Sequence, residues 1–313
     1  MLRLPKFELR RPRDLSEAIA LLAEAGPTAV VVAGGTDLVP NMKHELFTPE
    51  VVVSLEGLAE LRGLRREPDG ALSIGAMTSL EEVGANELVR AQAPALAQAC
   101  SLVAGPQLRS MGTLGGNVML DTRCQWYNQT HFWRAALGFC LKKDGTLCHV
   151  VEGGRKCVAA ASNDSAPALM TLGAQLSFAS PRGRREIPID ALWKSDGIWN
   201  KAAERDEILT SVRVPPQAAG HRGAYGKLRD RASIDFPLLG VAVRIDLAAD
   251  GTVADADLVV VALAAKPLRV KGIAAELAGA SPAEPGFDER VAAVAERAGR
   301  QCTPLANVPG DHE

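Results

Sequence analysis

Hydrophobic and polar residues near the start of the chain predict a small α/β unit. Apolar positions recur at helical spacing over residues 14–26, with Asp14 or Ser16 as a possible N-cap and Gly26 as the end of the helix. A β-branched run at 29–33 predicts a buried strand, because it stops abruptly at a pair of glycines. A second valine-rich run follows before the pattern changes.

The rest of the chain alternates between strand and helix patterns. Helices are expected from about Ser79, at 94–103 and from about Ser165, and a hairpin is expected before a further strand that ends at Pro215. From about residue 218, longer strands precede helical segments, which predicts a separate C-terminal domain with strands packed under helices. The sequence therefore predicts an α+β chain. Its expected parts are 1–217, divided into 1–55 and 56–217, and 218–313.

Two Gly-Gly loops follow apolar, strand-like segments. They contain Gly34 and Gly35 in "VVAGGTDL", and Gly115 and Gly116 in "MGTLGGNV". Loops of this kind let backbone N–H groups approach a phosphate closely, so together they suggest a dinucleotide. Neither loop matches GxGxxG or the P-loop pattern, and each pair taken alone is also typical of an ordinary turn.

Composition and charge narrow the class of protein. A chain of 313 residues with 47% hydrophobic residues can bury a large core. Its formal net charge of -2 gives no general attraction to nucleic acid or to an anionic membrane surface. No apolar run is long enough to suggest a membrane span or a signal segment. We therefore expect a cytoplasmic protein with reduced cysteines and no nucleic-acid or membrane partner.

Four of the six cysteines lie within the short stretch 123–157. Their spacing is Cys124-x15-Cys140-x7-Cys148-x8-Cys157, which contains no CxxC pair of the kind common at zinc sites. They could be unrelated buried thiols. The surrounding sequence is rich in turns and charges, however, and a metal centre can fold a segment that lacks a core of its own.

The motifs "VVAGGTDLVP", "MGTLGGNV", "SNDSAPAL" and "KLRDRASIDFPLLGVAV" follow one another along the chain. In this order they resemble the FAD-binding subunit of the molybdenum hydroxylases. The resemblance implies the two-part, PCMH-type FAD-binding domain of the xanthine dehydrogenase medium subunit, followed by a C-terminal flavoprotein domain. It implies no catalytic residue on this chain. The implied FAD-binding residues are Val32, Ala33, Gly34, Gly35, Thr36, Asp37, Leu38, Thr113, Gly115, Gly116, Asn117, Asp164 and Lys227.

The separation between Asn117 and Asp164, 47 positions, is longer than in most of that family, which indicates an insertion at about 121–160. Its four cysteines are similar in spacing to an insertion in the β subunit of 4-hydroxybenzoyl-CoA reductase. This resemblance implies a [4Fe-4S] cluster held by four residues: Cys124, Cys140, Cys148 and Cys157.

The same resemblance implies an electron-transfer role. Electrons would pass from ferredoxin through the [4Fe-4S] cluster and FAD to a small subunit with two [2Fe-2S] clusters. They would then reach a molybdopterin-binding large subunit, where 4-hydroxybenzoyl-CoA would be reductively dehydroxylated. The implied assembly is a dimer of heterotrimers.

Two alternatives remain open at this stage. The chain could be the FAD subunit of an NAD-linked aromatic or purine hydroxylase in which the cysteines are incidental. It could also be a flavin-free scaffold whose cysteine-rich stretch forms a zinc-stabilised interaction module.

Overall fold

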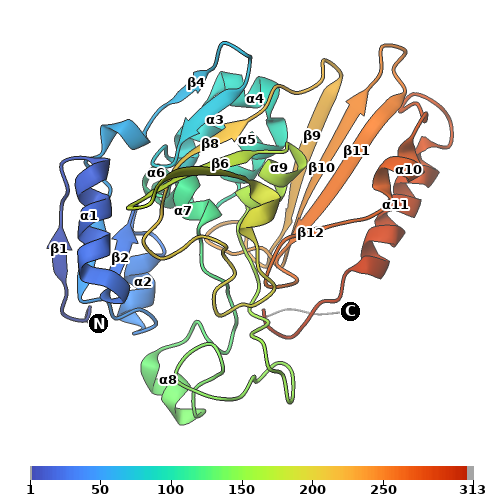
Figure 1. Cartoon of the computed structure of the whole chain (residues 1–313). Helices are drawn as coiled ribbons and strands as arrows, with labels where there is room; N and C mark the ends of the chain where they lie inside the picture. Colours follow the sequence, from blue (N-terminus) through green and yellow to red (C-terminus); the bar gives the residue numbers. More distant parts are fainter. Residues whose placement is uncertain (1, 309–313) are drawn as a thin grey trace.

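Three β-sheets and the helices packed against them form the fold (Figure 1). The computed structural model describes residues 2–308. The strand orders of the sheets are β1-β3-β2, β4-β5-β8-β6-β7 and β12-β11-β10-β9. The first sheet is parallel and the other two are antiparallel. An α+β chain was predicted, and this is confirmed.

The first sheet and the helix that covers it form the small α/β unit predicted from the sequence. Asp14 caps the first helix, because its side chain accepts a hydrogen bond of 2.8 Å from the backbone N–H of Glu17. Gly26 ends that helix with a φ of 59°. The short strand β1 was not predicted. The bounds are β1 (Glu8–Arg10), α1 (Leu15–Ala25), η1 (Gly26–Thr28), β2 (Ala29–Val32), α2 (Leu38–Lys43) and β3 (Val51–Ser54).

The second sheet lies beside a group of short helices, and the main hydrophobic core lies between them. Ser79 caps the predicted helix after β5 by accepting a hydrogen bond of 3.1 Å from Glu82 N. The predicted hairpin is β6 with β7. The bounds are η2 (Ala59–Leu61), β4 (Leu64–Arg66), β5 (Leu72–Gly75), α3 (Leu80–Ala85), α4 (Glu87–Gln92), α5 (Pro94–Ser101), α6 (Pro106–Met111), α7 (Leu114–Val118), α9 (Ser165–Thr171), β6 (Gln175–Ser180), β7 (Gly183–Pro188), η3 (Ile189–Leu192) and β8 (Ile208–Val214).

The third sheet is covered on both faces, which explains its alternating apolar residues. Val259 packs into the main core, towards α5 and α9, whereas Leu258 and Val260 pack against α10 and α11 on the outer side (Figure 1). The C-terminal sheet is thus fused to the rest of the molecule through a shared core. The bounds are β9 (His221–Leu228), β10 (Leu239–Leu247), β11 (Val253–Val261), β12 (Leu268–Arg269), α10 (Ile273–Leu277) and α11 (Phe287–Gln301).

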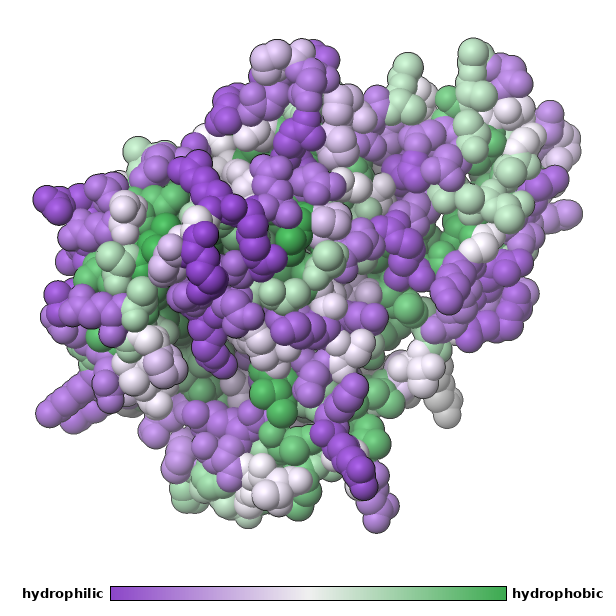
Figure 2. Space-filling model, in the orientation of Figure 1, coloured by the Kyte–Doolittle hydropathy of each residue, from purple (hydrophilic) through white to green (hydrophobic). Residues whose placement is uncertain are grey.

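The cysteine-rich insertion forms a separate lobe below the second sheet in Figure 1 and contains α8 (His131–Ala136). An antiparallel bridge between Arg123 and Ala160 closes its neck. Its small core includes three of its cysteines and also Leu46 from the first subdomain. On the face seen in Figure 2, hydrophilic residues predominate, with hydrophobic residues scattered among them, including on this lower lobe. In α8, Phe132 is 84% exposed.

Candidate functional site

A large cleft lies where the two Gly-Gly loops, the start of the insertion and a loop of the C-terminal domain meet. Its volume is about 980 Å³, at the upper end of the range for small-molecule and cofactor sites. Eleven of the thirteen residues predicted to bind FAD line it: Ala33, Gly34, Gly35, Thr36, Asp37, Leu38, Thr113, Gly115, Gly116, Asn117 and Asp164. Val32 and Lys227 do not line it.

The glycines let the two loops approach each other closely. A Cβ atom on Gly34 would lie 1.8 Å from the carbonyl oxygen of Met111, just before the second loop. Gly35 has a φ of +71°, a conformation that residues with a side chain rarely adopt. A Cβ on Gly115 would lie 2.7 Å from the Cβ of Ala76. The sequence suggested close approach to a phosphate; the structure shows that Gly34 is required for packing against the start of the second loop, and Gly115 for packing against the segment after β5.

Asn117 connects the second loop to the helix that follows Asp164. Its side-chain oxygen accepts hydrogen bonds from Ser165, at 3.0 Å from the backbone N and 2.6 Å from Oγ. Asn163 donates in return to the carbonyl oxygen of Asn117 at 2.7 Å. These contacts span 46 to 48 positions of sequence, so they hold the two ends of the insertion together beside the cleft.

Asp37 and Arg123 form an ion pair at the edge of the cleft. Burial raises the pKa of the Asp37 carboxyl, and the Arg123 charge opposes this shift. The Arg123 guanidinium also lies 4.1 Å from the ring centroid of Phe236 in the C-terminal domain. Arg123 and Phe236 both line the cleft and were missed by the sequence analysis. An arginine at the border of the insertion is the one local signal that could have pointed to this pair.

Asp164 is almost completely buried at the base of the cleft, with 2% of its surface exposed. Its carboxylate accepts hydrogen bonds from the Tyr225 hydroxyl at 2.7 Å and from the Lys227 ammonium at 3.0 Å. Burial raises the pKa of Asp164 and lowers that of Lys227, and the attraction between the two charges opposes both shifts. Tyr225 and Lys227 belong to β9, so this contact joins helix α9 to the C-terminal sheet.

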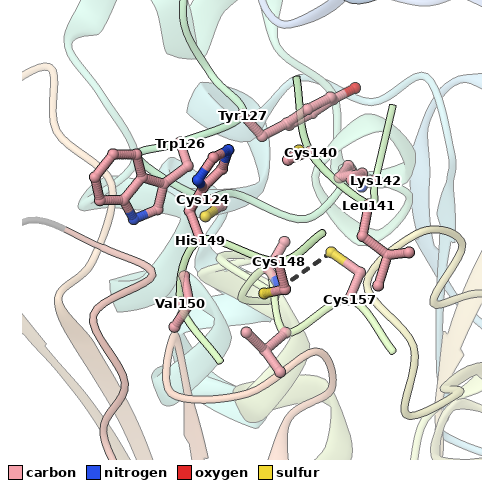
Figure 3. A pocket seen from close by; sticks show the side chains of 12 residues that line it. Cys124, Trp126, Tyr127, Cys140, Leu141, Lys142, Cys148, His149, Val150 and Cys157 are labelled. Carbon is pink, nitrogen blue, oxygen red and sulfur yellow. Dashed lines mark hydrogen bonds between the residues drawn. The ribbon is translucent and has the colours of Figure 1, made fainter. Parts of the chain in front are cut away.

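The four cysteines of the insertion surround one cavity next to the cleft. Figure 3 shows the Cys124, Cys140, Cys148 and Cys157 side chains arranged around a common centre. Burial raises the pKa of the Cys124 and Cys157 thiols to about 11. The wall also contains Trp126, and His149 is stacked on its ring at a centroid distance of 5.3 Å.

This cysteine arrangement differs from a mononuclear metal site. In residues 2–308 no group of three or more His, Cys, Asp or Glu side chains is placed to hold a single metal ion. A tetrahedral zinc site needs its sulfurs packed closely around one ion. Thiolates on a cluster each bind a different iron atom and therefore stand further apart. The structure thus places four thiols around one largely apolar cavity.

Two family models match the chain. The first, the FAD binding domain in molybdopterin dehydrogenase, matches residues 5–217. The second, the CO dehydrogenase flavoprotein C-terminal domain, matches residues 224–313. The chain belongs to the FAD-binding subunits of the molybdenum hydroxylase family. The resemblance stated from the four sequence motifs is confirmed at this level, and the flavin-free scaffold finds no support.

Individual relatives agree with this assignment. The medium chain of carbon monoxide dehydrogenase from Hydrogenophaga pseudoflava is 30% identical over 307 residues, covering 98% of this chain and 91% of the relative. The xanthine dehydrogenase FAD-binding subunit of Escherichia coli O157:H7 is 32% identical over 238 residues, covering 76% of this chain and 68% of the relative.

Solved structures of the same family confirm the predicted fold. A chain of carbon monoxide dehydrogenase from H. pseudoflava, in a form that lacks the Mo-pyranopterin moiety of the cofactor, superimposes with a TM-score of 0.77 and 29% identity. The match covers 99% of this chain and 90% of that chain. Separately, none of the helices in the described part of this FAD-binding subunit is long and apolar enough to cross a membrane.

Proposed function

We propose that this chain is the flavin and iron-sulfur subunit of a molybdenum-dependent reductase, with FAD in the cleft and a [4Fe-4S] cluster in the cysteine cavity. The observation that carries the proposal is that all four cysteines of the insertion converge on one cavity whose wall is shared with the cleft. Four thiols are the donor set that holds a [4Fe-4S] cluster, and such a cluster would pass electrons one at a time.

The cleft fits FAD in size and in chemistry. Backbone of both Gly-Gly loops lines it, and Gly35 and Gly116 leave it free of side chains that would hold a pyrophosphate away. We assign the binding of FAD to the residues predicted from the sequence that line the cleft. Bound FAD would supply a centre that exchanges one or two electrons. Lys227 would act indirectly, because its ammonium holds the Asp164 carboxylate in position.

The cysteine cavity fits a cluster because its donors are four thiols and its other walls are mostly apolar. Burial favours the protonated form of Cys124 and Cys157, so their thiolates need the charge of a metal centre to be stable. Apolar surroundings also limit the access of solvent, which tunes the potential of a cluster.

The substrate and partners follow from the resemblance of the insertion. We propose that ferredoxin donates electrons to this cytoplasmic subunit and that a small subunit with two [2Fe-2S] clusters receives them. A molybdopterin-binding large subunit would then reduce 4-hydroxybenzoyl-CoA, and the complex would be a dimer of heterotrimers. The domain division at 217/218 is part of the proposal. It is supported by the loop between β8, which ends at Val214, and β9, which begins at His221.

Metal and flavin analysis tests this proposal directly. Anaerobically purified protein should contain about four iron atoms, matching acid-labile sulfide and one FAD per chain, with an EPR signal after reduction by dithionite. Cys140→Ser should lose the iron and the EPR signal. The matched control is Cys302→Ser, because Cys302 lies outside the insertion and lines neither cavity.

Other outcomes would replace the proposal. FAD without iron, together with unchanged NAD-linked activity in Cys140→Ser, would show that the chain is an ordinary hydroxylase flavoprotein. One zinc ion per chain would make the insertion a structural module instead.

A further inference from the structure

The cysteine cavity and the FAD cleft are separated by a partition of two side chains. Of the residues that line the cavity, Tyr127 and Lys142 also line the cleft. Figure 3 shows the Tyr127 ring extending from the cysteines, with its hydroxyl at the far end. The Lys142 ammonium lies 4.8 Å from the centroid of this ring. The partition therefore consists of an aromatic ring and a cation in contact.

Lys142 is held firmly in this partition although it carries a charge. Its side chain is 4% exposed, and its ammonium donates to Asp121 Oδ1 at 2.9 Å and to Thr122 Oγ1 at 2.7 Å. A third hydrogen bond goes to the carbonyl oxygen of Gly197. Charges in such a poorly hydrated position are weakly screened, so they act over longer distances than charges on the surface.

The ion pair between Lys142 and Asp121 has its positive end towards the cysteine cavity and its negative end towards the FAD cleft. Lys142 follows the cavity residue Cys140 by two positions and lines both cavities, whereas Asp121 lines the FAD cleft but not the cysteine cavity. Lys201 is also buried here and donates to the carbonyl oxygen of Leu120 at 2.9 Å, but burial lowers its pKa to about 7, so Lys142 is the cation that faces the cysteine cavity. The cysteine cavity thus faces the positive end of the pair.

We infer that the Lys142–Asp121 pair sets the potential of the redox centre in the cysteine cavity, with Lys142 favouring its reduced form and Asp121 opposing this. The inference rests on the proposed function, because it requires a cluster in that cavity. A centre that gains one electron becomes more negative, so a nearby fixed cation stabilises the reduced state and a nearby anion destabilises it. Lys142 and Asp121 exchange no proton and form no bond in this process.

The test is an anaerobic, EPR-monitored redox titration of the complete enzyme, with dithionite as the one-electron source and dye mediators. Lys142→Met should shift the midpoint potential of the cluster to a more negative value, and Asp121→Asn should shift it to a more positive value. Thr122→Val removes a hydrogen bond from the same ammonium without changing any charge, so it is the matched control and should leave the potential nearly unchanged.

The opposite signs separate an electrostatic role from a structural one, because mere loosening of the partition would move both variants in the same direction. Shifts of equal sign, or no shift, in variants with full iron and FAD would overturn the inference and leave the proposed function intact. Wild-type enzyme without iron would overturn the proposed function and the inference with it. If Lys142→Met fails to assemble, the sign of the Asp121→Asn shift decides.

Discussion

Replacing Lys227 by methionine should destabilise the protein strongly, because it leaves the buried Asp164 carboxylate without its cation. The side chain of Lys227 is 1% exposed and that of Asp164 is 3% exposed, and the Lys227 Nζ lies 3.0 Å from Asp164 Oδ2. At an effective dielectric constant of about 20, unit charges at this distance attract by about 5 to 6 kcal/mol. The Tyr225 hydroxyl still donates to Asp164 in the variant, so we expect a net loss of about 3 to 5 kcal/mol.

Urea unfolding of the purified chain measures this loss, and the double variant Asp164→Asn/Lys227→Met provides the control. With both charges removed, the cost should fall well below the sum of the single variants, since neither partner is left charged and alone. A cost for Lys227→Met of less than about 1 kcal/mol, or strict additivity in the double variant, would refute the reasoning.

The loss should also depend on pH in a defined direction. Burial already raises the pKa of Asp164, and removing the Lys227 charge removes the main influence that opposes this shift. A carboxyl whose folded-state pKa is raised stabilises the fold at low pH and loses that contribution as the pH rises through the folded-state value. The deficit of Lys227→Met should therefore be smaller at about pH 5 than at about pH 8. Equal deficits at both values would contradict this account.

Two further changes test the cleft and the insertion. Gly34→Ala should separate the two loops, because its Cβ would lie 1.8 Å from Met111 O. It should lower the free energy of unfolding by about 1 to 3 kcal/mol and reduce the retention of FAD. Gly57→Ala, with open space around it, is the control, and equal FAD retention in both variants would contradict the prediction. Asn307→Ala removes the hydrogen bond of 2.5 Å from Asn307 Nδ2 to Val158 O. The variant should lower the free energy of unfolding by about 1 kcal/mol and increase amide hydrogen exchange within the insertion; unchanged exchange would contradict this.

Features decided by a few neighbouring residues were predictable from the sequence. The helix after Asp14, the helix from about Ser79 and the β6–β7 hairpin all depend on side chains or turns within about four positions, and all are confirmed. The strands β1 and β4 were missed, because each has three residues and forms only through pairing with a distant segment.

The site shows the same division between local and long-range information. Paired glycines mark both loops of the cleft, but only at Gly35 is the need a local backbone property, because its φ is +71°; Gly34 and Gly115 are required by contacts with residues distant in sequence. Asp164 was expected to contact FAD, just before a helix from about Ser165. The structure shows no side-chain cap at this residue, because its carboxylate binds Tyr225 and Lys227 on the C-terminal sheet. A contact over 63 positions leaves no trace in local pattern.

Protein contacts position the cysteine cavity on two sides, in addition to whatever a metal centre contributes. The buried Arg134 side chain donates to the carbonyl oxygens of His44 and Glu45 at 3.2 and 3.1 Å, which ties α8 to the first subdomain. On the other side, the backbone N–H of Gln125 donates to Asn307 O at 2.7 Å. Here both anchors hold the insertion against the rest of the molecule, so the Tyr127 ring and the Lys142 ammonium keep a defined position between the two cavities, as the proposed effect of Lys142 on the potential requires.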